Sequence, residues 1–207
     1  MVISVFAKNR HRNFDVSCSA INITDTSCNC FKATARKLSN RQSYMHESSK
    51  PLITGNYKIS IENKHFVIND KKSGKLLTLE SRIHKIAEWN HSIDWSDIKY
   101  FIVPTSRASY LVAISRIAGA SGLGVNFRTI IVIDLNNGYF FWLDSLSTDS
   151  RFFYEKNGFL NFYLFDYSKS FLENLDYDHI SFQQQHYLLR NDKIVLVGTK
   201  PKTCDCK

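Results

Sequence analysis

Proline and cysteine are scarce in this sequence, and long hydrophobic runs are missing. Its 207 residues include three prolines and five cysteines. Apolar runs such as Ile130 to Ile133 are far shorter than the roughly 20 residues that a membrane-spanning helix requires. The apolar N-terminal stretch is also short, and its positive charges follow it, which is the wrong order for a secretory signal. We therefore expect no membrane segment and a cytoplasmic location.

The cysteines lie only near the two ends of the chain. Cys18, Cys28 and Cys30 are near the N-terminus, Cys204 and Cys206 are near the C-terminus, and residues 31–203 contain none. An odd number argues against a complete disulfide framework. The two closely spaced pairs could supply four thiolates to zinc only if the ends met, and a zinc knuckle normally separates its cysteines by two or more residues. We expect no metal site and no cofactor.

Aromatic residues are abundant, in contrast. Phe, Tyr and Trp make up 14% of the chain, hydrophobic residues 43% and charged residues 22%. These values are close to those of globular proteins and exclude a wholly disordered, collagen-like or coiled-coil chain. Many aromatic residues and few prolines favour a β-rich core over a helical bundle.

The net charge of +8 belongs to the two ends. Residues 1–50 carry eight Lys or Arg against three Asp or Glu, and residues 193–207 carry four against one, whereas the stretch between them is neutral. We therefore predict a basic, poorly ordered arm over 1–50, a single β-rich domain over 51–198 and a basic tail over 199–207. Nucleic acid could be contacted only through these basic ends.

Period-two alternation and hairpin turns dominate the region after Gly55. Tyr57, Ile59 and Ile61 alternate with polar residues, and turn sequences fall near residues 63, 72, 137, 157 and 191. Short connections make consecutive strands antiparallel neighbours. We expect strands at 57–61, 65–68, 76–79, 100–103, 109–117, 127–135, 139–143, 151–154, 159–165, 180–189 and 194–197.

This pattern predicts a mainly β fold, an antiparallel meander closed or doubled into a barrel, sandwich or partial propeller, with one or two short helices. The unbroken run Ile130 to Ile133 is typical of a strand that is covered on both faces. Ser168 to Leu175 is the best helix, with Ser168 as its cap. Residues 81–97 fit either one helical turn or a packed loop.

Two segments are candidates for partner contact. The loop Gly119–Gly124 is followed by a strand pattern and not by the helix that a dinucleotide site needs, so we interpret it as an exposed tip, with Ser121 and Gly122 as contacts. Residues 144–192 hold eight acidic against four basic residues, with aromatic residues nearby. Charged rims around aromatic anchors are common at protein interfaces. The candidate contacts in that segment are Phe171, Asp176, Tyr177 and Asp178.

Three stretches resemble small bacterial β-rich immunity proteins that are found beside polymorphic toxins. They are Gly119–Gly122, Ile133–Gly138 and Asp144–Ser147, within a region of about 110–197. The resemblance implies a non-enzymatic role, in which the protein binds and blocks another protein, such as a basic toxin, and it assigns no site residue. The alternative is a hydrolase-type or metal-dependent enzyme, whose site would be assembled from scattered residues such as His84, Glu88, Asp94 and Ser121.

Overall fold

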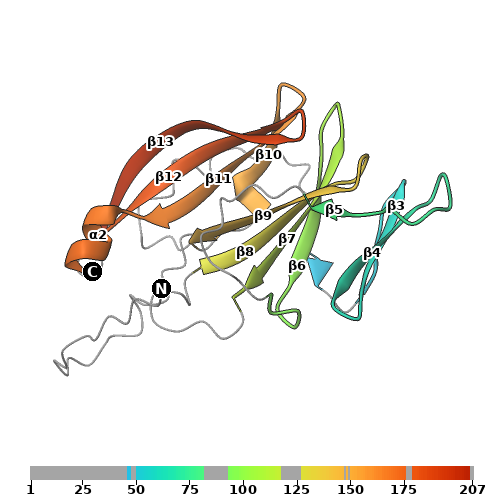
Figure 1. Cartoon of the computed structure of the whole chain (residues 1–207), viewed down its shortest axis with the longest axis horizontal. Coiled ribbons are helices and arrows are strands. Elements are labelled where there is room, and N and C mark those ends of the chain that lie inside the picture. Colours follow the sequence, from blue (N-terminus) through green and yellow to red (C-terminus); the bar gives the residue numbers. More distant parts are fainter. Residues whose placement is uncertain are drawn as a thin grey trace.

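The protein is mainly β and forms three stacked sheets (Figure 1). The computed structural model describes residues 46–47, 50–81, 93–117, 127–146, 148, 150–175 and 179–205. The central sheet contains, in spatial order, β1 (His46–Glu47), β6 (Lys99–Pro104), β7 (Ser109–Arg116), β8 (Phe127–Asp134), β9 (Tyr139–Leu146) and β5 (Glu80–Ser81). The second sheet contains β10 (Phe153–Lys156), β11 (Phe159–Tyr167), β12 (His179–Arg190) and β13 (Lys193–Asp205). The small sheet contains β2 (Leu52–Ile53), β3 (Tyr57–Glu62) and β4 (His65–Asp70).

Neighbouring strands run antiparallel, except that β5 pairs with β9 in parallel. This arrangement confirms the mainly β fold and is sandwich-like, and no sheet among the described residues closes into a barrel. Figure 1 shows the second sheet arching over one face of the central sheet, with the β3–β4 hairpin on the other side.

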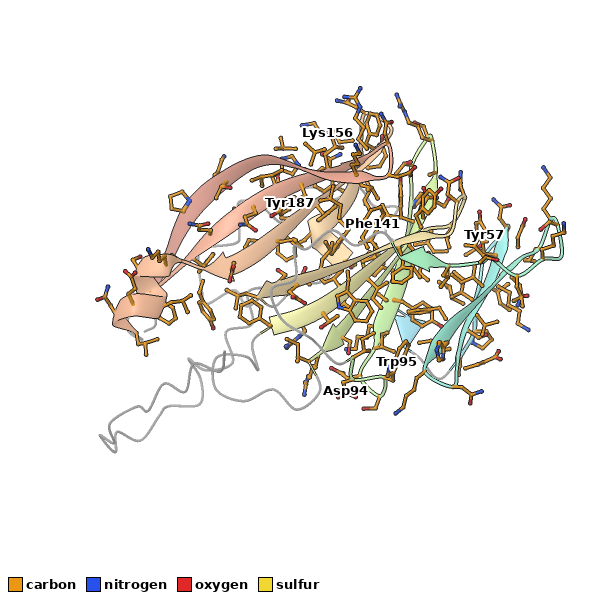
Figure 2. The ribbon with its side chains drawn as sticks, in the orientation of Figure 1. Tyr57, Asp94, Trp95, Phe141, Lys156 and Tyr187 are labelled. Atoms are coloured by element: carbon orange, nitrogen blue, oxygen red, sulfur yellow. The ribbon has the colours of Figure 1, made fainter. Side chains whose placement is uncertain are left out.

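The central sheet is buried on both faces, as its apolar run predicts. Ile130 and Val132 of β8 pack into a core shared with the second sheet, whereas Ile131 and Ile133 pack into a core shared with the small sheet. We call the core between the central and second sheets the first core, and the core between the central and small sheets the second core. Of the residues labelled in Figure 2, Phe141 and Tyr187 belong to the first core, and Trp95 and Tyr57 pack against the second. A stretch of strand covered on both sides has no solvent-facing positions for polar residues, which accounts for the run Ile130 to Ile133 in β8.

Three hairpins use turns with positive φ at both central residues. These pairs are Asn63–Lys64, Asn157–Gly158 and Asn191–Asp192. Such type I′ turns match the twist of the flanking strands and fix the register without slippage. The predicted turns at these places are confirmed.

The predicted helix is present as α2 (Lys169–Asn174), and a 3₁₀ turn covers Ser150–Phe152. The side chain of Ser168 accepts a hydrogen bond from the backbone N–H of Phe171 at 3.1 Å, as a capping serine should. Leu175, with φ of 50°, ends the helix. In the part of the chain that the structure describes, no helix has the length and apolar character needed to cross a membrane.

One predicted strand is wrong. Residues 76–79 make a single bridge, between Leu76 and Asn69, instead of a regular strand. The backbone N–H of Leu77 still donates to the carbonyl of Ile68 at 2.9 Å. The chain then leaves β4 because Leu77 and Leu79 pack into the second core on the way to β5.

The two ends of the predicted domain extend further than the sequence pattern indicates. His46 of β1 pairs with Tyr100 of β6, inside the range expected for the arm, whereas residues 1–45 lie outside the described residues. Residues 199–205, expected to form a basic tail, continue β13 as far as Asp205, which pairs with His179. Of the segment 81–97, residues 82–92 also lie outside the described residues.

Candidate functional site

Most of the partner contacts predicted from the sequence fall where the structure gives no description. Ser121, Gly122 and the segment Asp176–Asp178 lie outside the described residues and stay predictions. Phe171 is described, and only 2% of its surface is exposed. Its ring stacks on Tyr167 with centroids 4.9 Å apart. Phe171 therefore packs in the core and does not present a surface for a partner.

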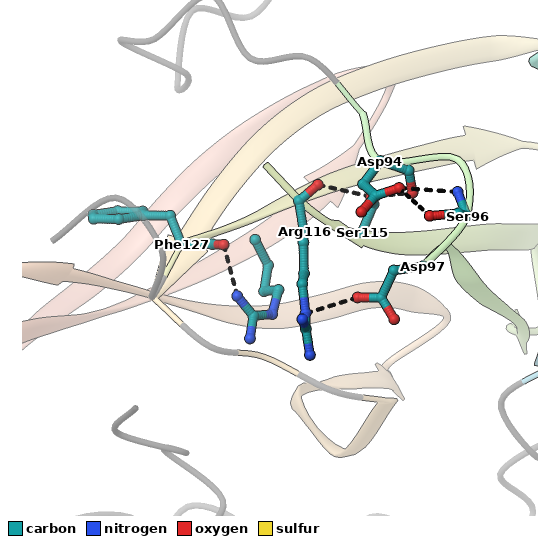
Figure 3. A network of polar contacts seen from close by, with 7 residues as sticks. Asp94, Ser96, Asp97, Ser115, Arg116 and Phe127 are labelled. Carbon is teal, nitrogen blue, oxygen red and sulfur yellow. Dashed lines mark hydrogen bonds and ion pairs between the residues drawn. The ribbon is translucent and has the colours of Figure 1, made fainter. Parts of the chain in front are cut away.

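Of the residues named for the enzymatic alternative, His84, Glu88 and Ser121 also lie outside the described residues, whereas Asp94 is described. Its carboxylate accepts hydrogen bonds from the backbone N–H and the hydroxyl of Ser96, and these bonds hold the pKa of Asp94 below its usual value (Figure 3). The hydroxyl of Ser115 donates to the Asp94 carbonyl at 2.9 Å. Asp94 thus stabilises the turn that leads into β6.

The same end of the central sheet carries an arginine pair (Figure 3). Arg116 forms an ion pair with Asp97 at 3.0 Å, and both side chains are exposed, so the pair adds little stability. Arg128 pairs with Arg116 across the strands and donates to the carbonyl of Phe127 at 2.9 Å. Burial, and then the charge of Arg116, lower the pKa of Arg128. The Arg116–Asp97 pair therefore links the end of β7 to the turn before β6, whereas the like charges of Arg116 and Arg128 repel each other.

A partly buried carboxyl group on β9 titrates near neutral pH. Burial, and then the charge of Asp166, raise the pKa of Asp144 to about 7. Its cross-strand partner Thr129 is buried, and the Thr129 hydroxyl has no hydrogen-bond partner among the described residues. Asp144 therefore makes the stability of the sheet depend on pH. Among the described residues, no group of three His, Cys, Asp or Glu is placed to hold a metal ion.

The most organised group of polar and aromatic side chains lies on the second sheet. Tyr154 of β10, Tyr163 of β11 and His186 of β12 are near-parallel rings, one from each of three neighbouring strands, which we call the ring row. Tyr154 lies beside both other rings, because its centroid is also 6.4 Å from that of His186 with planes at 14°. The centroids of Tyr154 and Tyr163 are 5.9 Å apart with planes at 21°, and those of Tyr163 and His186 are 4.7 Å apart at 25°. Each ring is only partly buried, so the row borders solvent.

Hydrogen bonds fix the orientation of the ring row. Nε2 of His186 is 3.2 Å from the hydroxyl of Tyr154 and 3.2 Å from Oδ1 of Asn161. The Tyr154 hydroxyl also donates to that of Tyr163 at 3.4 Å. Asn161 is held in turn by bonds from its amide to the carbonyls of Lys156 and Phe159. The position of the His186 ring is therefore determined by three strands at once.

The surroundings of the ring row favour an uncharged imidazole. Burial, and then the charge of Lys156, lower the pKa of His186 below its usual 6.5. Lys156 lies at the tip of the β10–β11 hairpin (Figure 2), and Arg107 sits over the ring of Phe159 in the same hairpin at 4.1 Å. The row is thus a neutral aromatic strip beside positive charge.

Next to the ring row is the sheet's edge strand, β13. Val195, Leu196 and Val197 are exposed by 46%, 51% and 55%. Gly198 pairs directly with His186, and the register shifts there, so that Val197 is an extra residue on the β13 side. Sequence reasoning missed this site because its residues are far apart along the chain. The turns at 157–158 and 191–192 were the available signal, since they fix which residues of each hairpin face one another.

Searches of protein families, of curated proteins and of solved structures found no match for this chain.

Proposed function

We propose that this protein is a non-enzymatic protein-binding module that takes an extended segment of its partner onto the edge of β13. The observation that carries the proposal is the run of exposed apolar side chains on this edge strand. An unpaired strand edge offers a row of backbone donors and acceptors to another chain, and exposed side chains along it add affinity and selectivity.

The geometry of β13 supports this use. It is 13 residues long, stands last in its sheet, and pairs only with β12 among the described residues. Proteins usually protect such edges with charges, prolines or bulges. In β13 these devices are Lys193 at the start, the bulge at Val197, and then Lys200 and Pro201, whereas Ile194 to Leu196 has none. The unprotected part is therefore the short stretch Ile194 to Leu196.

Charge identifies the kind of segment that fits. Lys193 and Lys200 are exposed on either side of the apolar run, and Arg190 is exposed at the end of the neighbouring strand. No Asp or Glu occurs in residues 193–204. Complementary charge steers association and fixes register. We therefore assign the edge to an extended partner segment with an apolar centre and acidic flanks.

This mode of action suits an immunity or inhibitor protein of a bacterial toxin in the cytoplasm, because such a protein acts by occupying its partner and not by chemistry. It also concerns a different part of the chain from the acidic segment Asp176–Asp178, which lies outside the described residues. If the partner is a basic toxin, that segment would contact its basic surface, while β13 would take an acid-flanked strand of the same partner.

The test uses a fluorescently labelled peptide of about ten residues, with a Thr/Val/Phe centre and glutamates at both ends. We expect fluorescence anisotropy to show saturable binding that Leu196→Glu weakens by about tenfold or more. Ile53→Glu is the matched control, because Ile53 is an equally exposed apolar residue, at 63%, on the small sheet. It should change binding less than about twofold. Absence of binding, or equal effects of both substitutions, would contradict the proposal.

A further inference from the structure

The ring row has a gap one residue wide at its β13 end. Tyr154, Tyr163 and His186 come from three successive strands, and the fourth strand contributes Gly198 at the position that pairs with His186. A Cβ added to Gly198 would meet no atom of the described residues within 4 Å. The described residues therefore leave open the space beside Gly198, next to the His186 ring.

One face of the His186 ring lies on the side of this gap, because His186 pairs directly with Gly198. Its other face is against Tyr163, at a centroid distance of 4.7 Å that equals the spacing between neighbouring strands. The Tyr163–His186 stack thus runs across β11 and β12, and its continuation leads over β13, whereas Tyr154 lies to the side of both rings, 6.4 Å from the His186 centroid. The hydrogen bonds of Nε2 to Tyr154 and Asn161 keep the ring in this orientation.

We propose that the gap over Gly198 receives an aromatic side chain of the partner segment, which stacks on the side of the His186 ring opposite Tyr163. This inference rests on the proposed function, since a strand added to the β13 edge would place one of its residues beside Gly198. An aromatic residue next to a glycine in a neighbouring strand commonly leans over the glycine and covers it.

The chemistry of the surroundings selects an aromatic ring over other side chains. Planar groups that stack on a ring are aromatic rings and the guanidinium of arginine. Lys156 acts electrostatically on His186, and Lys200 lies two residues beyond Gly198 on the same face of β13, so a further cation is disfavoured. The extra residue Val197 adds an exposed apolar side chain next to the gap. A neutral aromatic ring is planar, adds no positive charge and suits an apolar neighbour, so it meets all three conditions.

The test compares three peptides that differ only at the central residue, which is phenylalanine, cyclohexylalanine or alanine. We expect the wild-type protein to bind the phenylalanine peptide about tenfold more tightly than the alanine peptide, with the cyclohexylalanine peptide between them. Gly198→Val fills the gap and should abolish this preference. The fold should tolerate that change, because Gly198 has open space around it and no positive φ. His186→Gln removes the ring and should also abolish the preference, whereas Gly55→Val should leave it unchanged.

The outcomes separate the inference from the proposed function. If all three peptides bind wild type equally, the gap is not an aromatic site, although strand addition stands. If Gly198→Val keeps the preference, the inference is also overturned. If no peptide binds, the proposed function falls and the inference falls with it. An oligothymidylate that binds in a Gly198-dependent manner, in the absence of peptide binding, would assign the gap to a nucleobase and overturn the proposal.

Discussion

The carbonyl oxygen of Thr78 lies where a side chain at Gly138 would begin. A Cβ built on Gly138 would be 2.0 Å from that oxygen, and the φ of Gly138 is 77°. The turn before it is held by Asp134, whose carboxylate accepts from the backbone N–H of Asn136 at 2.8 Å and of Asn137 at 3.2 Å. The glycine that ends this turn therefore joins the β8–β9 hairpin to the segment leading into β5.

Substitution of Gly138 should destabilise the fold for two separable reasons. Gly74 has a similar φ of 70° but no atom within 4 Å of its Cβ position, so Gly74→Ala measures the backbone cost alone, about 1 kcal/mol. Gly138→Ala adds the displacement of Thr78 and should cost at least about 1–3 kcal/mol more. Urea denaturation of both variants measures the difference in the free energy of unfolding. Equal losses of unfolding free energy in the two variants would show that the Thr78 carbonyl does not obstruct a side chain at position 138.

Asp144 should make stability fall as pH rises toward neutrality. Its pKa is about 7 in the folded protein and 3.8 in its ordinary state, so the folded state binds the proton more tightly. The raised pKa of Asp144 therefore stabilises the folded state in full below pH 3.8, and this stabilisation is lost as pH rises through about 7. Asp144→Asn should flatten this part of the pH profile of the urea midpoint.

Asp166→Asn provides the matched test, because the charge of Asp166 is the second cause of the raised pKa of Asp144. The loss of stability should then occur at lower pH than in wild type. Two results would assign the pH dependence to other groups. One is a urea-midpoint profile in Asp166→Asn that falls at the same pH as in wild type, and the other is a profile in Asp144→Asn that falls as steeply as in wild type.

The charge state of His186 can be measured directly. NMR titration should give His186 a pKa below 6.5, because burial and then Lys156 disfavour its protonated form. Lys156→Gln should raise this pKa toward the ordinary value, whereas Lys58→Gln, on the small sheet, should not change it. A pKa at or above 6.5 in wild type would contradict the neutral ring row.

The sequence was informative where local chemistry decides the structure. The run Ile130 to Ile133 predicts two-sided burial, the type I′ turns follow from Asn-rich pairs, and Ser168 caps a short helix as expected. Residues 76–79 were misread because packing against the second core, and not strand pairing, fixes their path. Only part of the ring row was predictable. The turn at 157–158 sets Tyr154 against β11, whereas the place of His186 depends on the register between β11 and β12, which are joined through α2 and not by a tight turn.

Hydrogen exchange of β13 tests the central claim most directly. Strand addition would hydrogen-bond the backbone amides of β13 that do not face β12, so binding of the acid-flanked phenylalanine peptide should slow exchange at alternate residues between Lys193 and Lys200. The side-chain contacts of a partner lying on the sheet face would not produce this alternation. The account predicts protection of those alternate amides in wild type and its loss in Leu196→Glu. Protection confined to other strands, with β13 unchanged when the peptide is bound, would contradict it.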